Sequence, residues 1–398
     1  MLMDEFVKVP EVVAAARACL ARTAELLDLC IAVQQIPAPS LDESRRADWI
    51  EQRFRRLGLA DVRQDAARNV YGRIPGQVSE TALLVTAHSD TVFGLETDLT
   101  VTRDDVAGRV YGPGLGDNST GVAALLMLAE ILMGLPKPPV DIRLVANSGE
   151  EGIGDLIGMR TAMDALQTVA RASIVIEGMG LGRIVHRALG SRRYRIAVTA
   201  PGGHSWSDFG VASALHTLVQ LAAELTNLRA SETPRASFNI GRLKGGTSVN
   251  TIAQEAWLEL DLRGETQDVL QDLIGQTQAI IARYQGAKWG QRGVTVTATV
   301  IGDRPSGEIE AGHPLVQAAQ SALAAADYPG KPDLRISSTD ANVPLSRGVP
   351  SVCVGITDGG NAHRLQEWIQ TAALGQGMAH VVLLTWWAAD WLTQGETE

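Results

Sequence analysis

The chain has 398 residues, 45% of them hydrophobic, and its 45 acidic and 35 basic residues give a formal net charge of −10. This length favours two domains, and this share of hydrophobic residues excludes a disordered chain. The acidic balance, without any basic stripe, argues against a nucleic-acid partner and against binding to an anionic membrane.

The N-terminal sequence and the cysteines favour a cytoplasmic protein. The opening MLMDEF carries two acids where a secretory signal peptide would carry positive charge before an apolar run. Cys19, Cys30 and Cys353 form no CxxC pair, which fits a reducing compartment, and we expect all three in the core. Residues 368–389 contain no Asp, Glu, Lys or Arg, but polar residues and glycines interrupt them, so we expect a buried terminal helix and no membrane span.

The first part of the chain alternates between helical and strand-like patterns. Helical apolar spacing occurs over residues 11–32 and 43–57. Apolar runs typical of buried strands then end near residues 90, 148 and 178, with helices expected between them over 118–133 and 155–169. This order predicts an α/β domain with a mostly parallel sheet covered by helices.

The pattern changes near residue 190. The elements expected from there are a strand at 192–200, a helix at 209–228, strands at 236–243 and 255–263, a helix at 266–284 and a strand at 293–301. This β-α-β-β-α-β order is the ferredoxin-like split unit. The α/β pattern then resumes with a helix at 313–326, a strand at 351–355 and the terminal helix. We therefore expect a catalytic domain in two parts, 1–188 and 303–398, with a second domain inserted at 189–302; one large α/β domain with an irregular middle is the alternative.

Acidic residues and histidines follow the predicted strands of the first domain. They are His88, Asp90, Asp117 within a glycine-rich loop, Glu150, Glu151, Glu177 and His363. The carboxyl ends of parallel strands meet at one edge of a sheet, so these side chains should converge. Carboxylates that converge destabilise one another unless cations balance their charge. Two Zn²⁺ ions sharing Asp117 would do so, with Co²⁺ or Mn²⁺ as substitutes, and each ion would keep an open position.

Spacing suggests roles for two further carboxylates. Asp90 lies two residues after His88 on the strand end, so it can accept the proton of the ring nitrogen that does not bind metal. Glu150 and Glu151 are adjacent and point in different directions, so one can bind metal while the other serves as general base. Each motif alone also has a structural explanation, as a capped turn, a helix N-cap or acids at a helix N-terminus. Their joint order at successive strand ends is what makes the pattern specific.

The motifs HSDTV, GPGLGDNSTG, SGEEG, IEG and AHRLQEW, in this order, resemble the di-zinc metallopeptidase family of glutamate carboxypeptidase, acetylornithine deacetylase, succinyl-diaminopimelate desuccinylase, aminoacylase and peptidase T. The resemblance covers nearly the whole chain. It implies one ion on His88 and Glu177, another on Glu151 and His363, and Asp117 bridging both. It further implies Glu150 as the general base, Asp90 as the residue that orients His88, and a cis peptide bond between Asp117 and Asn118.

Three more matches lie in the inserted segment, which the resemblance identifies as a lid and dimerisation domain. His204 in PGGHSW would reach the site of the partner subunit in a homodimer and stabilise the oxyanion. Asn250 in KGGTSVNTIAQEA would contact substrate, and Arg263 in LDLR would hold a substrate carboxylate. A turn-stabilising histidine and a surface ion pair are the structural alternatives for His204 and Arg263.

Other polar residues match no ligand position of the family. His186, His216, His313 and His380 are expected to be structural. Asp340, within SSTDANVPLS, is expected to cap a helix and not to bind metal.

The resemblance implies a metal-dependent hydrolase of small N-acyl amino acids or short peptides with a free carboxylate. A hydroxide bridging the two ions, activated by Glu150, would attack the amide or peptide bond. Glutamate at position 177 favours a carboxypeptidase or N-deacylase, and a di- or tripeptide aminopeptidase resembling peptidase T is the alternative. A non-catalytic metal or amino-acid binding protein would lack a ligand or the base, and neither is missing. A dehydrogenase would need GxGxxG after the first strand, where the chain has none.

Overall fold

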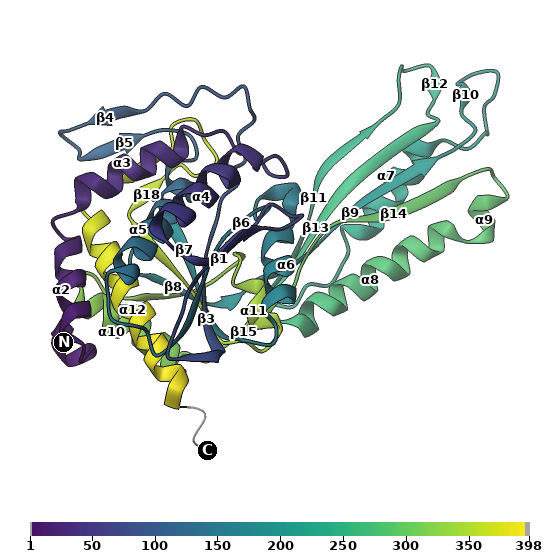
Figure 1. Cartoon of the computed structure of the whole chain (residues 1–398). Helices are drawn as coiled ribbons and strands as arrows, with labels where there is room; N and C mark the ends of the chain where they lie inside the picture. Colours follow the sequence, from purple (N-terminus) through teal and green to yellow (C-terminus); the bar gives the residue numbers. More distant parts are fainter. Residues whose placement is uncertain (1, 395–398) are drawn as a thin grey trace. The chain divides into compact units, whose positions relative to one another are not determined.

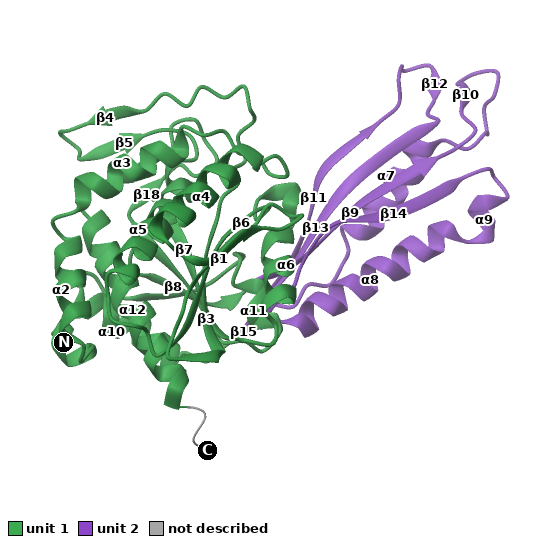
Figure 2. Cartoon of the chain, viewed as in Figure 1, with its two compact units in different colours: residues 1–188, 308–398 green, residues 189–307 purple. Residues whose placement is uncertain are grey.

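The computed structural model describes residues 2–394. The chain forms two compact units (Figure 2). Unit 1 contains the chain up to Ala188 and from Glu308 onward, and unit 2 is Leu189–Gly307. The expected second boundary, between residues 302 and 303, falls inside strand β14 (Thr295–Arg304), so unit 2 ends a few residues later than the sequence pattern suggested.

Unit 1 is organised around a large mixed sheet (Figure 1). In spatial order its strands are β1 (Ala60–Gln64), β2 (Val70–Ile74), β6 (Val140–Asn147), β3 (Val78–His88), β7 (Ala170–Met179), β17 (Ser351–Thr357), β8 (Arg183–Ala188) and β15 (Gly307–Glu308), with β16 (Asp333–Ser337) beside β8. The central strands β6, β3, β7 and β17 run parallel, which confirms the α/β class. The sheet margins differ from the expectation, because β2 pairs antiparallel with both β1 and β6, and β8 pairs antiparallel with β17.

Alternating side chains of the parallel strands form a core on each face of this sheet. Leu83 and Val85 of β3 face one core, and Leu84 faces the other. The first core is covered by α2 (Pro10–Cys19), α3 (Thr23–Gln34), α4 (Ser44–Leu57), α5 (Gly121–Met133), α10 (Pro314–Ala325) and α12 (Leu374–Gln394), with the short α1 (Met3–Phe6) at its margin. The second core is covered by α6 (Ile157–Leu166) and α11 (Asn342–Ser346). Burial on both faces explains why these strands are almost continuously apolar.

The helical stretch expected over residues 11–32 is two helices, α2 and α3, separated by a turn at residues 20–22. The terminal helix α12 packs closely against this turn at Gly375, where a Cβ atom would lie 2.7 Å from the carbonyl oxygen of Cys19 and 2.9 Å from the Cα of Leu20.

Helix α12 is buried over most of its length, as expected. The segment Leu115–Met133 is long and apolar enough to cross a membrane, but 89% of its most apolar window is buried inside the protein, as for a core helix. The three cysteines are also buried and unpaired, which confirms their expected place in the core.

Unit 2 contains one four-stranded antiparallel sheet with two long helices. Its elements in chain order are β9 (Gly190–Thr199), α7 (Ala214–Leu225), β11 (Ala236–Gly245), β13 (Glu255–Gly264), α8 (Gln267–Gln285), the short α9 (Ala287–Gly290) and β14, and the spatial strand order is β11-β13-β9-β14. Leu258 and Leu260 of β13 pack with Leu218 of α7 and Leu273 of α8 in a separate core. A two-stranded extension, β10 (Gly203–His204) with β12 (Thr251–Ile252), continues the β9–β13 pair beyond the sheet (Figure 1).

A small antiparallel sheet in unit 1 carries one of the predicted site residues. It consists of β4 (Thr102–Asp104), β5 (Arg109–Tyr111), β19 (Trp368–Gln370) and β18 (Gly359–Gly360). The loop between β18 and β19 contains His363. This sheet thus links the C-terminal part of unit 1 to the chain just before Asp117.

Candidate metal centre

The candidate centre lies at the carboxyl ends of the parallel strands. His88 is the last residue of β3, and Glu177 lies near the end of the neighbouring strand β7. Asp117 comes from η1 (Leu115–Thr120), a turn that leads into α5 and whose backbone angles are not helical at Asp117 and Asn118. The edge of the sheet therefore brings together residues that are far apart in the chain.

Asn118 fixes the Asp117 turn beside Glu177. Its side-chain amide donates to the carbonyl of Ile176 (2.9 Å) and accepts from the amide of Gly178 (2.7 Å), so it bonds to β7 on both sides of Glu177. A Cβ atom at Gly178 would lie 2.0 Å from the carbonyl oxygen of Gly116, so only glycine permits this approach. The peptide bond Asp117–Asn118 is cis, as the resemblance implied.

Within residues 2–394, two groups of side chains could each hold a metal ion, and they share Asp117. In the first group, His88 Nε2 lies 3.1 Å from Asp117 Oδ1 and 3.6 Å from Glu177 Oε2. In the second, His363 Nε2 lies 2.9 Å from Glu151 Oε1 and 3.2 Å from Asp117 Oδ2. Each oxygen of Asp117 thus faces a different histidine, which is the arrangement that a bridging ligand requires. Glu150 belongs to neither group, although it precedes Glu151.

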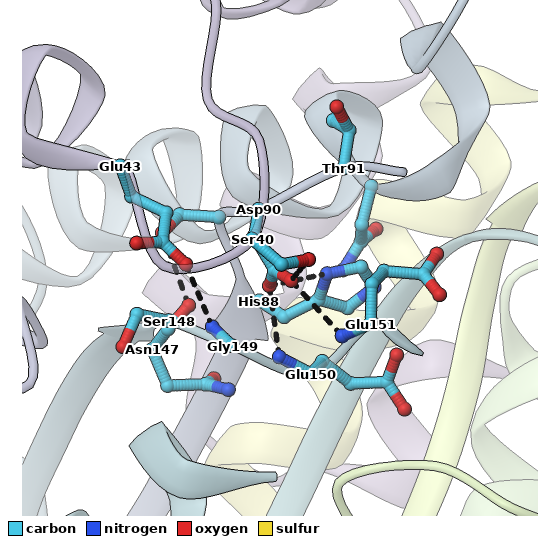
Figure 3. Close-up of polar contacts among 12 residues, drawn as sticks. Ser40, Glu43, His88, Asp90, Thr91, Asn147, Ser148, Gly149, Glu150 and Glu151 are labelled. Carbon is cyan, nitrogen blue, oxygen red and sulfur yellow. Dashed lines mark hydrogen bonds and ion pairs between the residues drawn. The ribbon is translucent and has the colours of Figure 1, made fainter. Parts of the chain in front are cut away.

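Asp90 holds the turn that carries Glu150 and Glu151 (Figure 3). Its Oδ1 accepts the amide of Glu150 and its Oδ2 the amide of Glu151, both at 2.9 Å. Oδ2 also accepts the hydroxyl of Ser40 at 2.6 Å. The contact to His88 is looser, with Asp90 Oδ1 at 3.4 Å from His88 Nδ1. Asp90 therefore makes its shortest contacts with the Glu150–Glu151 turn and with Ser40.

The two histidines partly balance the charge of the three carboxylates that they face. Burial lowers the pKa of His88, but the charge of Glu177 and the hydrogen bond to Asp117 outweigh it and hold this pKa well above its usual value. Hydrogen bonds to Asp117 and Glu151 raise the pKa of His363 to about 10. Burial acts to raise the pKa of Asp117, yet the two histidines outweigh it and lower that pKa below its usual range.

This donor set fits two divalent cations. Imidazole and carboxylate groups are ligands of Zn²⁺, and Co²⁺ or Mn²⁺ accepts the same set. Bound cations would take over the positive charge that protons on His88 and His363 otherwise supply. Nδ1 of His88 is buried, has no hydrogen-bond partner in the described part of the chain, and faces Asp90. A metal-bound histidine needs such an acceptor for its second ring nitrogen.

Sequence comparison identifies the family of the chain. A family model described as peptidase family M20/M25/M40 matches residues 84–386. The chain belongs to this peptidase family. The matched range contains all the candidate ligands, the Glu150–Glu151 turn and the whole of unit 2.

Relatives and solved structures agree with this membership. Succinyl-diaminopimelate desuccinylase of Corynebacterium glutamicum is 25% identical over 342 residues, which cover 83% of this chain and 88% of that protein. A tripeptidase from Staphylococcus aureus has a TM-score of 0.76 at 20% identity, covering 92% of this chain and 99% of that structure. A dinuclear metal-binding peptidase of Bacillus subtilis has a TM-score of 0.65 at 16% identity, covering 93% and 99%. The two structures show that the chain has the fold of this peptidase family.

Two of the three residues that the family resemblance suggested in unit 2 lie together. The β10–β12 ladder pairs His204 with Thr251, and the amide of Ser205 donates to the carbonyl of Asn250 at 3.0 Å. Nδ1 of His204 accepts the amides of Trp206 (3.2 Å) and Ser207 (3.4 Å). In the neutral ring the proton must then be on Nε2, which makes this nitrogen a hydrogen-bond donor.

Arg263 lies at the other end of β13. Glu255, eight residues earlier on the same strand, is paired with Thr199 where the β10–β12 extension begins. At about 3.3 Å per residue, these eight steps span about 26 Å. The Nε of Arg263 donates to Asp261 at 2.7 Å, and the side chain is partly exposed. Within unit 2, therefore, Arg263 does not lie with His204 and Asn250.

His313 and Asp340 have structural contacts, and the expectation about Asp340 is wrong. Nδ1 of His313 accepts the amide of Leu315 at the start of α10. Asp340 does not cap α11, whose first turn has no side-chain cap. Its buried Oδ2 instead accepts Asn147 Nδ2 at 2.7 Å, because the loop before α11 lies over the end of β6. Asp340 belongs to neither of the candidate metal groups found in the described residues.

Residues around helix α4 support the centre, and the sequence analysis assigned them no role. Glu43 Oε1 accepts the amide of Leu41 at 2.9 Å. It also accepts the amide of Gly149 at 3.0 Å (Figure 3). The buried guanidinium of Arg46 donates to the carbonyls of Ile36 and Ser89. The only sequence signal was a polar cluster, APSLDESRR, next to a helix start, which is also common in ordinary surface loops.

Proposed function

We propose that this protein is a two-zinc hydrolase that cleaves an amide or peptide bond in small N-acyl amino acids or short peptides with a free carboxylate. Family membership by itself supports hydrolysis of peptides or acyl amino acids in general. The observation that carries the proposal is the shared aspartate: the two oxygens of Asp117 face two histidines that each have a further carboxylate close by.

Two ions at these positions would polarise the substrate carbonyl and lower the pKa of a water molecule. His88 and Glu177 would hold one ion, Glu151 and His363 the other, and Asp117 both. His88 and Glu151 are buried, whereas the side chain of His363 is 52% exposed. The buried ligands would anchor the ions, and the exposed side of the centre would admit substrate.

Glu150 would be the general base and acid. Its neighbour Glu151 belongs to a candidate metal group and Glu150 does not, so the pair supplies one ligand and one carboxylate for proton transfer. Both amides are bonded to Asp90, which fixes the turn from which the two side chains project. Glu150 would take a proton from the attacking water and give it to the leaving nitrogen.

His204 and Asn250 would stabilise the tetrahedral oxyanion and orient the substrate. Nε2 of His204 is a donor in the neutral ring because Nδ1 accepts two backbone amides. A prealigned donor aimed at developing negative charge is an effective source of transition-state stabilisation. Asn250 lies directly beside His204 and could donate to the same substrate.

We propose that His204 acts in the site of the partner subunit of a homodimer. Arg263 is about 26 Å along the strand from the segment that carries His204 and Asn250, a span greater than a small substrate. All three can contact one substrate only if they come from different copies. Trp206, Phe209 and Val249, which flank His204 and Asn250, are 86%, 90% and 102% exposed, as expected of side chains that a second copy covers.

The substrate class rests on Arg263 and Glu177. A guanidinium such as Arg263 binds a carboxylate through two parallel hydrogen bonds, which favours substrates with a free α-carboxylate. The resemblance to the di-zinc metallopeptidases implies that glutamate at position 177 accompanies carboxypeptidases and N-deacylases. The fold of the staphylococcal tripeptidase keeps a di- or tripeptide aminopeptidase as the alternative.

Hydrolysis of a panel of N-acetyl and N-succinyl amino acids, beside a panel of di- and tripeptides, tests this proposal. We expect turnover of substrates with a free carboxylate, loss of turnover after chelation, and recovery with Zn²⁺. Preference for peptides with a free amino group would favour the aminopeptidase. Activity that resists chelation would refute the metal mechanism, and metal binding without any turnover would indicate a binding protein.

A further inference from the structure

Glu367 is a buried acid that contacts the turn carrying Asp117. It lies just before β19, four residues after His363, and its side chain is fully buried. Its Oε1 accepts the amide of Gly116 at 2.6 Å and the amide of Asp117 at 2.9 Å. Its Oε2 is buried and has no hydrogen-bond partner among residues 2–394. One oxygen of this buried carboxyl group thus accepts two hydrogen bonds, and the other accepts none from the described residues.

The main chain of Glu367 holds the same segment. Its carbonyl accepts the amide of Gly112 at 2.9 Å, and its amide donates to the carbonyl of Arg364 at 3.0 Å. Glu367 therefore bonds to the chain from residue 112 to 117 at both ends and also to the loop that carries His363. The loops that contribute Asp117 and His363 meet at this one residue.

Asp90 makes similar backbone contacts, although it uses a different oxygen for each amide. Each of the two acids accepts the amides of two successive residues, Gly116 and Asp117 for Glu367, Glu150 and Glu151 for Asp90. The second amide of each pair belongs to a candidate metal ligand. Glu367 bonds to the backbone amide of Asp117 and not to its side chain. Both carboxylate oxygens of Asp117 therefore stay available to face the two histidines.

We propose that Glu367 is a positioning residue for the metal centre: it fixes the backbone of Asp117 so that its two oxygens face the two ion sites. The proposal rests on the proposed function only in that divalent ions bind at Asp117. Without the acceptor, two buried amides would lose their partner, and the turn would move to find another. Such movement would weaken both ions together, because Asp117 is the ligand that both share.

Two variants of Glu367 separate positioning from simple loss of a residue. Glu367→Ala removes the acceptor, whereas Glu367→Gln keeps an amide oxygen that can accept both backbone amides. The matched control is Asp141→Ala. Asp141 is also buried and accepts a backbone amide, that of Gly76 at 2.8 Å, but it lies near the amino end of β6. The six residue steps from Asp141 to Asn147 place it about 20 Å from the strand end that leads to Glu150.

The readouts are the number and affinity of bound Zn²⁺ ions, measured by elemental analysis at buffered free zinc, and the visible absorption spectrum of the Co²⁺-loaded full chain. We expect Glu367→Ala to bind both ions about 10–100-fold more weakly and to change the cobalt spectrum. Glu367→Gln should restore affinity and spectrum to near the wild type. Asp141→Ala should lower the unfolding temperature and leave both metal readouts unchanged.

Wild-type affinity and spectrum in Glu367→Ala would overturn the proposal, as would equal metal loss in Asp141→Ala, since loss of stability alone would then explain the effect. A Glu367→Gln variant as weak as Glu367→Ala would also contradict it, because the geometry of the acceptor would not be what matters. If the wild-type chain bound no ions, the proposed function would fail and this proposal with it. If the wild type bound two and Glu367→Ala did so equally well, only this proposal would fail.

Discussion

Replacing Asp90 by alanine should destabilise unit 1 because it removes the acceptor that holds the Glu150–Glu151 turn. The lost contacts are the two amides at 2.9 Å and the Ser40 hydroxyl at 2.6 Å. A hydrogen bond to a charged group contributes about 1.5–3 kcal/mol, so the two amides alone correspond to about 3–6 kcal/mol. This is a large part of the 5–15 kcal/mol that stabilises a typical domain.

Equilibrium urea unfolding of the chelator-treated protein measures this loss without the contribution of bound metal. Ser40→Ala, which removes one of the contacts, should cost about 1–3 kcal/mol. Asp90→Asn should fall between the two, because its one carbonyl oxygen can accept only part of what two carboxylate oxygens accept. Hydrogen exchange at the amides of Glu150 and Glu151 should accelerate in Asp90→Ala. Unfolding within about 1 kcal/mol of the wild type, with unchanged exchange at these amides, would refute the reasoning.

Three further predictions follow from the candidate centre and the core. His363→Ala should leave about one ion per chain and Asp117→Ala should weaken both, as elemental analysis can show, since Asp117 is shared. Burial lowers the pKa of His380 to about 4, below its unfolded value near 6.5. The unfolded chain therefore binds a proton first as pH falls, and wild-type stability should drop between pH 7 and 4.5 by about 2–3 kcal/mol more than that of His380→Gln in urea unfolding. If His204 acts across a dimer, mixing inactive His204→Ala and Glu150→Gln chains should restore about a quarter of wild-type turnover, whereas a residue acting within its own subunit would restore none.

The sequence predicted the parts of the site that depend on strand ends. His88, Asp117, Glu151 and Glu177 follow or precede elements whose patterns are long and strongly apolar, and parallel strands bring their carboxyl ends to one edge. The convergence of these side chains therefore follows from secondary structure alone. His363 was placed in the same set because it follows a glycine-rich turn, although no strand pattern marks its position in a loop between two very short strands.

The supporting residues could not be predicted, because their role depends on contacts between distant segments. Glu367 bonds to an amide 251 positions away, and Glu43 to one 106 positions away. Neither partner is a side chain, so no pair of residue types marks the contact. Asp340 was misassigned because its partner, the side-chain amide of Asn147, lies 193 positions away in the chain.

The elements of the fold also divide into those that the sequence pattern predicted and those that it did not. Apolar runs marked the central parallel strands and helical periodicity marked the long helices, whereas β4, β5 and β19 have three residues each, too few for any pattern. The antiparallel strands at the margins, such as β1 and β8, are more polar and were not distinguished from loops. The end of α2 also carried no Gly or Pro to mark the turn that packs closely against α12.

The central claim is that two ions held through Asp117 and a separate carboxylate, Glu150, together hydrolyse an amide bond. Glu150→Gln tests it most directly, with metal content and turnover measured on the same preparation. The account predicts about two ions per chain and a loss of turnover of about 10²–10⁴-fold or more. Near-normal turnover in a variant that still holds two ions would contradict it.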